Sequence, residues 1–203
     1  MATPSDENAH PVRARIIQHA RQHFLMHGFR GVSMDDLAVG LGISKKTLYA
    51  HFASKAEVLK EVIHAKFGEV EADLERLASA DGSNFPNRLQ QLLECLQGHL
   101  KEPQPPFMRD MQREPEIFAW IQTLRRERIQ RHFGKLFEEG RRAGLIRKDV
   151  PPKVVIEILL GAIEAVINPQ KLEELELTPK SAFPIIVTVV LQGILTEKGR
   201  SQS

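Results

Sequence analysis

Apolar residues recur along most of this chain at spacings of three and four residues, the period that places side chains on one face of an α-helix. Ile16, Ala20 and Phe24 show this pattern near the start. A longer stretch carries it through Leu59, Ile63, Phe67, Val70, Leu74 and Leu77. The strict alternation of apolar and polar residues that is typical of strands does not occur. We therefore expect an all-α fold.

Glycines, prolines and polar clusters divide this pattern into nine expected helices, at residues 12–27, 34–40, 45–51, 55–78, 86–100, 107–113, 116–143, 152–167 and 180–197. A break is expected at residues 81–84, and Asn168-Pro169 should stop the eighth helix, because proline cannot continue a helical ladder. The charged residues 171–177 then read as a loop. Residues 1–10 are polar and contain prolines, so we expect a disordered tail.

Three successive helix starts in the first third of the chain carry strong capping signals. Ser33 and Ser54 each precede an acidic residue by three positions, as in a capping box, and Ser44 can cap the helix between them. Gly42 suits the intervening turn because glycine adopts positive φ without strain. Two short helices joined by a glycine turn are the plan of a helix-turn-helix, whose second helix enters a DNA major groove.

The last two expected helices are apolar on nearly all sides. Residues 154–167 and 183–195 contain few polar positions, and such helices need cover on nearly all sides. A self-complementary four-helix interface in a two-fold homodimer would provide that cover. A deep monomeric core is the alternative. Gly161 and Gly193 would permit a close crossing of the helices.

Composition limits the classes of function. The chain has 203 residues, of which 42% are hydrophobic, and its formal net charge is only +2, so DNA binding would depend on a local group of cations. One cysteine excludes an internal disulfide. No catalytic motif is present, and we expect no enzyme, no cofactor and no metal. No secretory signal is visible, and the longest apolar run is interrupted by glutamates, so we expect a cytoplasmic protein without membrane contact.

The region of the three helix starts resembles the DNA-binding domain of the TetR family of bacterial transcriptional repressors. The matching positions are apolar, capping and polar residues together: Phe24, Gly28, Phe29, Val32, Ser33, Leu37, Ala38, Leu41, Gly42, Ile43, Ser44, Thr47, Leu48, Tyr49, His51, Phe52, Lys55 and Leu59. Lys46 departs from the family, which often has glycine there. The resemblance covers roughly the first 60 residues. It implies a nine-helix architecture with a helix-turn-helix domain at residues 11–55 and a ligand-binding and dimerisation domain at residues 56–203.

The resemblance also implies that the helix over residues 45–51 lies in the major groove, where lysine can donate to guanine and a threonine methyl can touch thymine. Lys55 and Ser33 would hold phosphates at two helix starts, with Arg13 and Arg15 as further backbone contacts. The expected DNA-binding residues are Ser33, Ser44, Lys45, Lys46, Thr47, Tyr49, His51 and Lys55. A homodimer would place two such helices about one DNA turn, ~34–36 Å, apart on a near-palindromic operator.

A small-molecule effector, of unknown identity, is implied for the C-terminal domain, where it would release the repressor from its operator. Candidate lining residues are Phe67, Cys95, His99, Phe107, Met108, Met111, Trp120, Leu124, Phe137 and Ile163. The simpler alternative is that these are ordinary core residues. Buried Glu157 and Glu164 would favour a cationic ligand, whereas exposed ones would edge a dimer helix. A protein partner in place of the ligand, and activation in place of repression, also stay open.

Two further patterns suggest chemistry but have simpler explanations. His19, His23 and His27 recur at every fourth position, a spacing that can chelate a metal. Their stripe runs beside the apolar one, so we expect them to edge the core. Cys95 has an apolar helical spacing, which favours a buried, inert thiol over a redox sensor.

Overall fold

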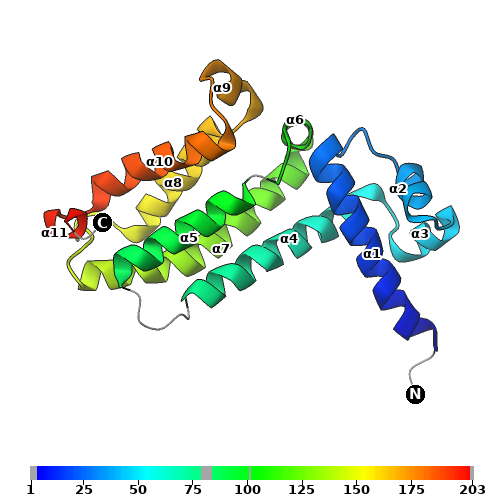
Figure 1. The fold of residues 1–203 in the computed structure, drawn as a ribbon, viewed down its shortest axis with the longest axis horizontal. Coiled ribbons are helices and arrows are strands. Elements are labelled where there is room, and N and C mark those ends of the chain that lie inside the picture. The colour runs from blue at the N-terminus through cyan, green and yellow to red at the C-terminus, as the bar shows by residue number, and fades with distance from the viewer. Residues whose placement is uncertain (1–3, 79–83, 101, 202–203) are drawn as a thin grey trace. The chain divides into compact units, whose positions relative to one another are not determined.

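The computed structural model describes residues 4–78, 84–100 and 102–201, with side chains from residue 11 onward. In that part of the chain eleven helices follow one another, and the strand-like pairing is limited to an isolated bridge between Ile146 and Leu195 (Figure 1). The expectation of an all-α fold is confirmed. The helices are α1 (Pro4–His27), α2 (Met34–Leu41), α3 (Lys45–His51), α4 (Lys55–Ala78), α5 (Phe85–His99), α6 (Pro105–Gln112), α7 (Pro115–Arg142), α8 (Pro152–Val166), α9 (Pro169–Glu174), α10 (Pro179–Ile194) and α11 (Glu197–Arg200).

The first helix begins earlier than the sequence suggested. α1 starts at Pro4, so the expected disorder is wrong for residues 4–10, while residues 1–3 lie outside the described residues. Proline is favoured at a first helical position because its φ is preset and its missing N–H would have no helical partner there. Pro11 then lies inside the helix. A start after Pro11 was expected because prolines are usually excluded from helix interiors.

Two short helices occupy segments that were expected to be loop or the end of a longer helix. Asn168 was interpreted as a stop, but its side chain also accepts the Lys171 N–H at 3.0 Å and caps α9. Thr196 caps α11 in the same way, by accepting the Gly199 N–H at 3.1 Å. Each capping residue therefore ends one helix and begins the next. The expected break at residues 81–84 lies outside the described residues except for Asn84, which caps α5.

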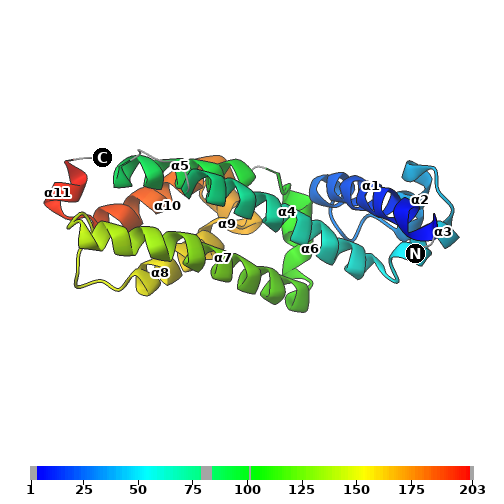
Figure 2. The same ribbon diagram turned by 90° about the horizontal axis from the view of Figure 1, so that it is seen from below.

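The chain divides into two compact units. The first unit comprises Met1–Gly68 and Glu102–Phe118, and the second comprises Glu69–Lys101 and Ala119–Ser203. The first unit thus holds α6 and the start of α4 in addition to α1, α2 and α3. The expected domain boundary at residue 55 instead follows the end of the helix-turn-helix. α4 is one unbroken helix that begins in the first unit and ends in the second (Figure 2).

The core of the first unit joins the helix-turn-helix to α1 and α4. Ile16, Phe24, Leu37, Leu48 and Leu59 are each at most 1% exposed. Burying a side chain of this size stabilises a fold by about 1.5–3 kcal/mol. The short α2 and α3 would be marginal in isolation, and they are held by this packing.

Glu102 ties the segment before α6 to two other helices of the first unit. Arg21 of α1 donates to it through Nε at 2.5 Å and through Nη2 at 3.0 Å, and Lys66 of α4 forms a second ion pair. Burial alone would raise the pKa of Glu102, but the hydrogen bonds from Arg21 and Lys66 outweigh it and lower the pKa to about 2. The Gln104 N–H also donates to the Leu25 carbonyl at 2.9 Å. This segment is therefore fixed to α1 by side chain and backbone alike.

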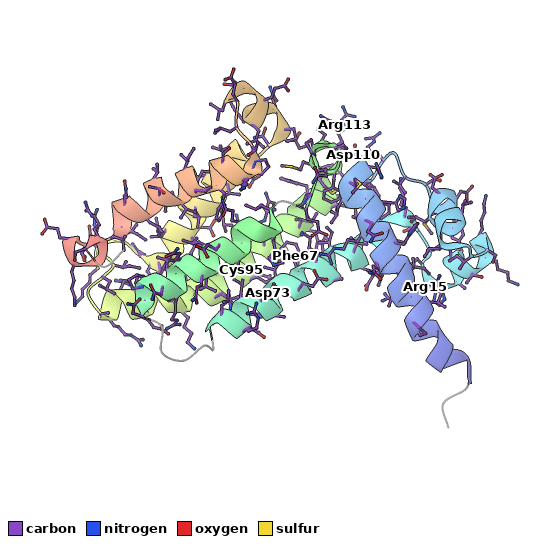
Figure 3. The ribbon with its side chains drawn as sticks, in the orientation of Figure 1. Arg15, Phe67, Asp73, Cys95, Asp110 and Arg113 are labelled. Atoms are coloured by element: carbon purple, nitrogen blue, oxygen red, sulfur yellow. The ribbon has the colours of Figure 1, made fainter. Side chains whose placement is uncertain are left out.

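The turn after α1 requires glycine for two reasons. Gly28 has a φ of 92°, in the left-handed region that other residues rarely adopt. A Cβ at this position would lie 2.6 Å from Oδ2 of Asp110 on α6. That carboxylate accepts the Arg30 N–H at 2.8 Å, and Figure 3 shows Asp110 on α6. The close approach of α6 to this turn thus depends on the missing side chain.

The second unit has its own hydrophobic core, to which α4, α5, α7, α8 and α10 contribute. Leu74, Leu92, Phe133, Ile156 and Ile194 are representative members, one from each helix. The end of α10 is fixed to the turn after α7, because the Arg147 N–H donates to the Ile194 carbonyl at 2.9 Å. Among the described residues, no helix combines the length and apolar character needed to cross a membrane.

Candidate DNA-binding site

The helix-turn-helix forms through the capping contacts that the sequence predicted. Ser33 and Asp36 make a complete capping box, in which Oγ of Ser33 accepts the Asp36 N–H at 3.1 Å and Oδ2 of Asp36 accepts the Ser33 N–H at 2.8 Å. Ser44 caps α3 by accepting the Thr47 N–H at 3.0 Å. Gly42 ends α2 with a φ of 65°. These contacts set the angle between α2 and α3 before any DNA is bound.

α3 buries one face and exposes the other. Leu48 is fully buried on the inner face, and Phe52, directly after the helix, is 1% exposed. Lys45 and Lys46 are exposed at the first turn, and the Tyr49 side chain follows one turn later with 50% exposure. An exposed aromatic ring that no core contact requires is available to a partner surface. The outer face of α3 therefore presents two cations and one aromatic ring.

The two lysines at the start of α3 differ in their surroundings. Nζ of Lys45 donates to Oδ2 of Asp35, on the first turn of α2, at 2.5 Å. The hydrogen bond to Asp35, reinforced by its negative charge, raises the pKa of Lys45. No hydrogen bond or ion pair to another described residue is recorded for Lys46. The sequence analysis missed Asp35, because a contact between two helices ten positions apart leaves no periodic signal.

The remaining expected residues of α3 are less exposed. Thr47 is half-buried, and its hydroxyl lies 2.8 Å from Oγ of Ser44, so the two hydroxyls share a hydrogen bond at the cap. His51 is half-buried at the end of the helix. Local bonding of the Thr47 hydroxyl leaves its methyl group as the part of the side chain with no hydrogen-bonding role.

Lys55 does not have the geometry expected of a phosphate contact. Its Nζ donates to the carbonyl oxygens of Phe29 at 2.9 Å and Val32 at 2.8 Å, and it lies 4.5 Å from the centre of the Phe29 ring. Burial is the main cause of the lowered pKa of Lys55. The ammonium group is thus turned toward the loop between α1 and α2. The side chain fastens that loop to α4, and a phosphate role is not supported for it.

The expected phosphate site at Ser33 is also altered by a neighbour. The Asp36 carboxylate accepts hydrogen bonds from both the N–H and the hydroxyl of Ser33. These bonds, that of the side chain first, lower the pKa of Asp36. A negative charge already occupies the anion position at this helix start, so a phosphate there would be repelled.

Arg13 and Arg15 were both expected to contact the DNA backbone, and the structure separates them. Arg13 pairs with Glu61 of α4 at 2.9 Å and lies 4.9 Å from the centre of the Phe52 ring. It therefore braces α1 against the helix-turn-helix. Arg15 is exposed on α1, and no contact with a described residue is recorded for it (Figure 3).

The three histidines of α1 stack beside the core, as expected. The ring centres of His19 and His23 are 4.3 Å apart, and those of His23 and His27 are 5.8 Å apart. Burial, followed by the neighbouring His23, lowers the pKa of His19. A Cβ on Gly40 would lie 2.5 Å from Nε2 of His19, so this imidazole fills the space beside a glycine of α2. The stripe contributes to packing between α1 and α2.

The ten effector candidates fall into both units. Phe67, Phe107, Met108 and Met111 belong to the first unit, and the other six belong to the second. Phe137 is 1% exposed and packs edge-on against Phe133 at 6.0 Å, as a core residue does. A groove of about 360 Å³ between α5 and α10 is lined mainly by Leu, Val and Phe side chains, and by none of the ten. A pocket lined by these candidates stays a prediction.

The two carboxylates of α8 are exposed. Glu157 accepts hydrogen bonds from Arg126 at 3.1 Å and from Gln130 at 3.0 Å, both on α7. Glu164 is exposed one and a half turns further along. Neither lines a buried cavity in the second unit. A role for this pair in holding a cationic ligand is therefore not supported.

Comparison with known proteins agrees with this geometry. Residues 16–62 match the family described as bacterial regulatory proteins, tetR family. Over the whole chain, the HTH-type transcriptional repressor DhaR of Mycobacterium sp. (strain GP1) is 25% identical, covering 91% of this chain and 93% of that protein. The structure of SmeT, the repressor of the Stenotrophomonas maltophilia multidrug efflux pump SmeDEF, is similar with a TM-score of 0.70 at 19% identity, covering 91% of each chain. A SmeT–triclosan complex is similar with a TM-score of 0.67 at 18% identity, covering 91% of this chain and 92% of that one.

The matched segment contains the capped helix-turn-helix and its exposed α3, and the similarity of fold extends over both units. The curated relatives are transcriptional regulators. The chain is therefore a member of the TetR family of bacterial regulatory proteins, a DNA-binding regulator of transcription.

Proposed function

We propose that the chain is a homodimeric repressor that binds a near-palindromic operator through α3 and leaves it when a small molecule binds the second unit. The observation that carries the proposal is the outer face of α3, where Lys45, Lys46 and Tyr49 are exposed on a helix whose inner face is buried. Recognition helices meet base edges with their N-terminal residues. The two cations lie at that end.

Each exposed group of α3 has a distinct task in this proposal. Lys46, with no recorded partner, donates to a guanine edge or a phosphate. Lys45 exchanges the Asp35 carboxylate for a DNA acceptor, which keeps an unbound head from attracting anions indiscriminately. The Thr47 methyl touches a thymine methyl, and Tyr49 contacts the backbone or a flanking base. Ser44 serves mainly as the cap, and Arg15 is the further backbone contact on α1.

Dimerisation through α8 and α10 is supported by the apolar residues that these helices leave exposed. Val154 and Ile158 on α8 are 47% and 54% exposed, and Ile185 and Val189 on α10 are 53% and 68% exposed. Each pair is separated by four positions and so lies on one face of its helix. Apolar side chains grouped in this way mark an interaction surface. A two-fold axis would bring the same two faces together and cover them.

The effector is assigned to the second unit by analogy. The similar SmeT structure exists as a triclosan complex, which supports a small organic molecule as the ligand class. The chain's own α4 joins the units as a single helix, so a ligand that displaces its second half would also displace its first half, which is packed against the helix-turn-helix. This gives two distinct sites one shared moving element, as coupling requires.

Replacing Lys46 by alanine tests the assignment of α3 to DNA. On a duplex selected by the wild-type protein, we expect a loss of affinity of about tenfold, because one charge-assisted contact is lost in each protomer. If the lysine holds a phosphate, the slope of log K against log salt also falls by about one per protomer. Fluorescence anisotropy over a series of salt concentrations measures both quantities.

The matched control is Lys135→Ala, which removes the same charge from an exposed position on α7. It should leave affinity and salt slope unchanged. Equal effects from the two variants would mean that only net charge matters, and α3 would lose its special role.

A further inference from the structure

Three residues with metal-binding side chains converge between α4 and α5 of the second unit. Asp73 lies on α4, and Cys95 and His99 lie on α5. One carboxylate oxygen, the thiol sulfur and one imidazole nitrogen all lie within 4.8 Å of one another. Figure 3 shows Asp73 and Cys95 close together on their two helices. Cys95 and His99 are four positions apart, which places them on one helical face.

The cluster is held together before any ion binds. Nε2 of His99 lies 3.2 Å from Oδ2 of Asp73, and Oδ1 of Asp73 accepts a hydrogen bond from Arg76 at 3.0 Å. The Asp73 carboxylate thus uses one oxygen toward the solvent-exposed Arg76 and the other toward the cluster. All three members are half-buried, so an ion could enter and a water or ligand could reach it.

The thiol is protonated in these surroundings. Burial raises the pKa of Cys95, and the negative charge of Asp73 raises it further. A thiol beside a carboxylate has no stabilised thiolate to offer an oxidant, which argues against a redox sensor. A divalent cation reverses this balance, because it attracts the thiolate and the carboxylate together.

We propose that Asp73, Cys95 and His99 bind a divalent transition-metal ion of the zinc class. The ligands would be Sγ of Cys95, Nε2 of His99 and Oδ2 of Asp73, with water in the fourth position, a donor set that suits tetrahedral Zn²⁺. In such a tetrahedron the ligand atoms are ~3.3–3.8 Å apart. The present separations of up to 4.8 Å require only small side-chain rotations. On binding, the Cys95 proton passes to solvent and a metal–sulfur bond forms.

A second group, Glu71, Glu75 and His132, has similar separations but a different environment. Glu71 is engaged by Arg128 at 3.3 Å and also by Arg131. Two guanidinium groups already neutralise the carboxylate, so a metal ion would have to displace both. This group also lacks a sulfur ligand. It therefore serves as the internal control for the proposed site.

Metal binding at Asp73, Cys95 and His99 would fasten α4 to α5. α4 begins in the first unit at Lys55 and packs there against the helix-turn-helix. The sequence analysis expected no metal, because Cys95 and His99 alone were too few ligands and the third lay on another helix.

Cobalt titration of the full chain without an affinity tag tests the site. Co²⁺ should give a near-ultraviolet thiolate-to-cobalt charge-transfer band, and Zn²⁺ should abolish it by displacement. Cys95→Ser should remove the band, and Asp73→Asn and His99→Gln should each weaken Co²⁺ binding at least about tenfold, since even outer-shell changes cost 10–100-fold. His132→Gln should behave as the wild type.

Circular dichroism of each variant shows whether the fold is retained, so a lost band in a folded variant is a loss of ligand. Two outcomes would overturn the site: a wild-type cobalt complex without the charge-transfer band, or a band that survives Cys95→Ser. A band lost equally in His132→Gln would also contradict it, because binding would then not be specific to this cluster.

Discussion

Val189→Lys is expected to convert the protein to a monomer and to lower operator affinity by at least ~100-fold. The change affects DNA binding although Val189 lies on α10, in the other unit from the helix-turn-helix. A single head reads only a few base pairs, and without its partner it should approach non-specific affinity, with a Kd of about 10⁻⁴–10⁻⁶ M. Specific complexes commonly reach about 10⁻⁸–10⁻¹¹ M.

The size of the effect follows from the symmetry of the proposed interface. Val189 is 68% exposed in the single chain, so lysine should not disturb folding. In a two-fold dimer the change occurs twice on one surface, and two unpaired charges would have to leave water. Ile158→Lys on α8 should act in the same way. Sedimentation velocity measures the mass in solution, and anisotropy measures the affinity.

The matched control for this change is Leu175→Lys, since Leu175 is also apolar and is 48% exposed, at the end of α9. It should remain dimeric and bind the operator normally. A Val189→Lys protein that keeps the mass and affinity of the wild type would refute dimerisation through α8 and α10.

Lys55→Ala is expected to destabilise the protein by about 2 kcal/mol while leaving the salt slope of DNA binding unchanged. The ammonium group donates two hydrogen bonds to backbone carbonyls and packs against the Phe29 ring. A hydrogen bond from a charged donor contributes about 1.5–3 kcal/mol, and a cation–π contact adds to it. The loss should loosen the loop between α1 and α2.

The two roles considered for Lys55 give opposite signatures. A tether affects the midpoint of denaturant unfolding, whereas a phosphate contact affects the salt slope by about 0.9 for each phosphate released. Lys60→Ala, at an exposed position on the same helix, controls for loss of a charge. A Lys55→Ala protein of wild-type stability with a reduced salt slope would restore the phosphate role and contradict the observed geometry.

The helix-turn-helix was predictable because its signals are local. Ser33, Ser44 and Gly42 act on backbone groups within three or four positions, and each forms the cap or turn that its type and spacing indicated. The buried face of α3 was predictable for the same reason, since helical periodicity places Leu48 inward. The start of α1 was missed because a proline at position 11 outweighed the weaker signal of one at position 4.

The direction of individual charged side chains could not be predicted from spacing. Lys55 was expected to face DNA, but the carbonyl groups that bind it come from a loop more than twenty positions earlier. Lys45 meets Asp35 across the turn between two helices. Asp73 joins Cys95 and His99 only because α4 and α5 pack together. Such contacts depend on the tertiary arrangement and leave no pattern along the chain.

Selection of duplexes from a random-sequence library with the full-length protein tests the central claim most directly. We expect enrichment of a near-palindrome whose half-sites are about one helical turn, ~34–36 Å, apart. The Lys46→Ala protein should either select a different base within each half-site or enrich the same sequence with lower affinity. Failure of the wild-type protein to enrich any sequence, or enrichment of a single asymmetric site, would contradict recognition by paired α3 helices.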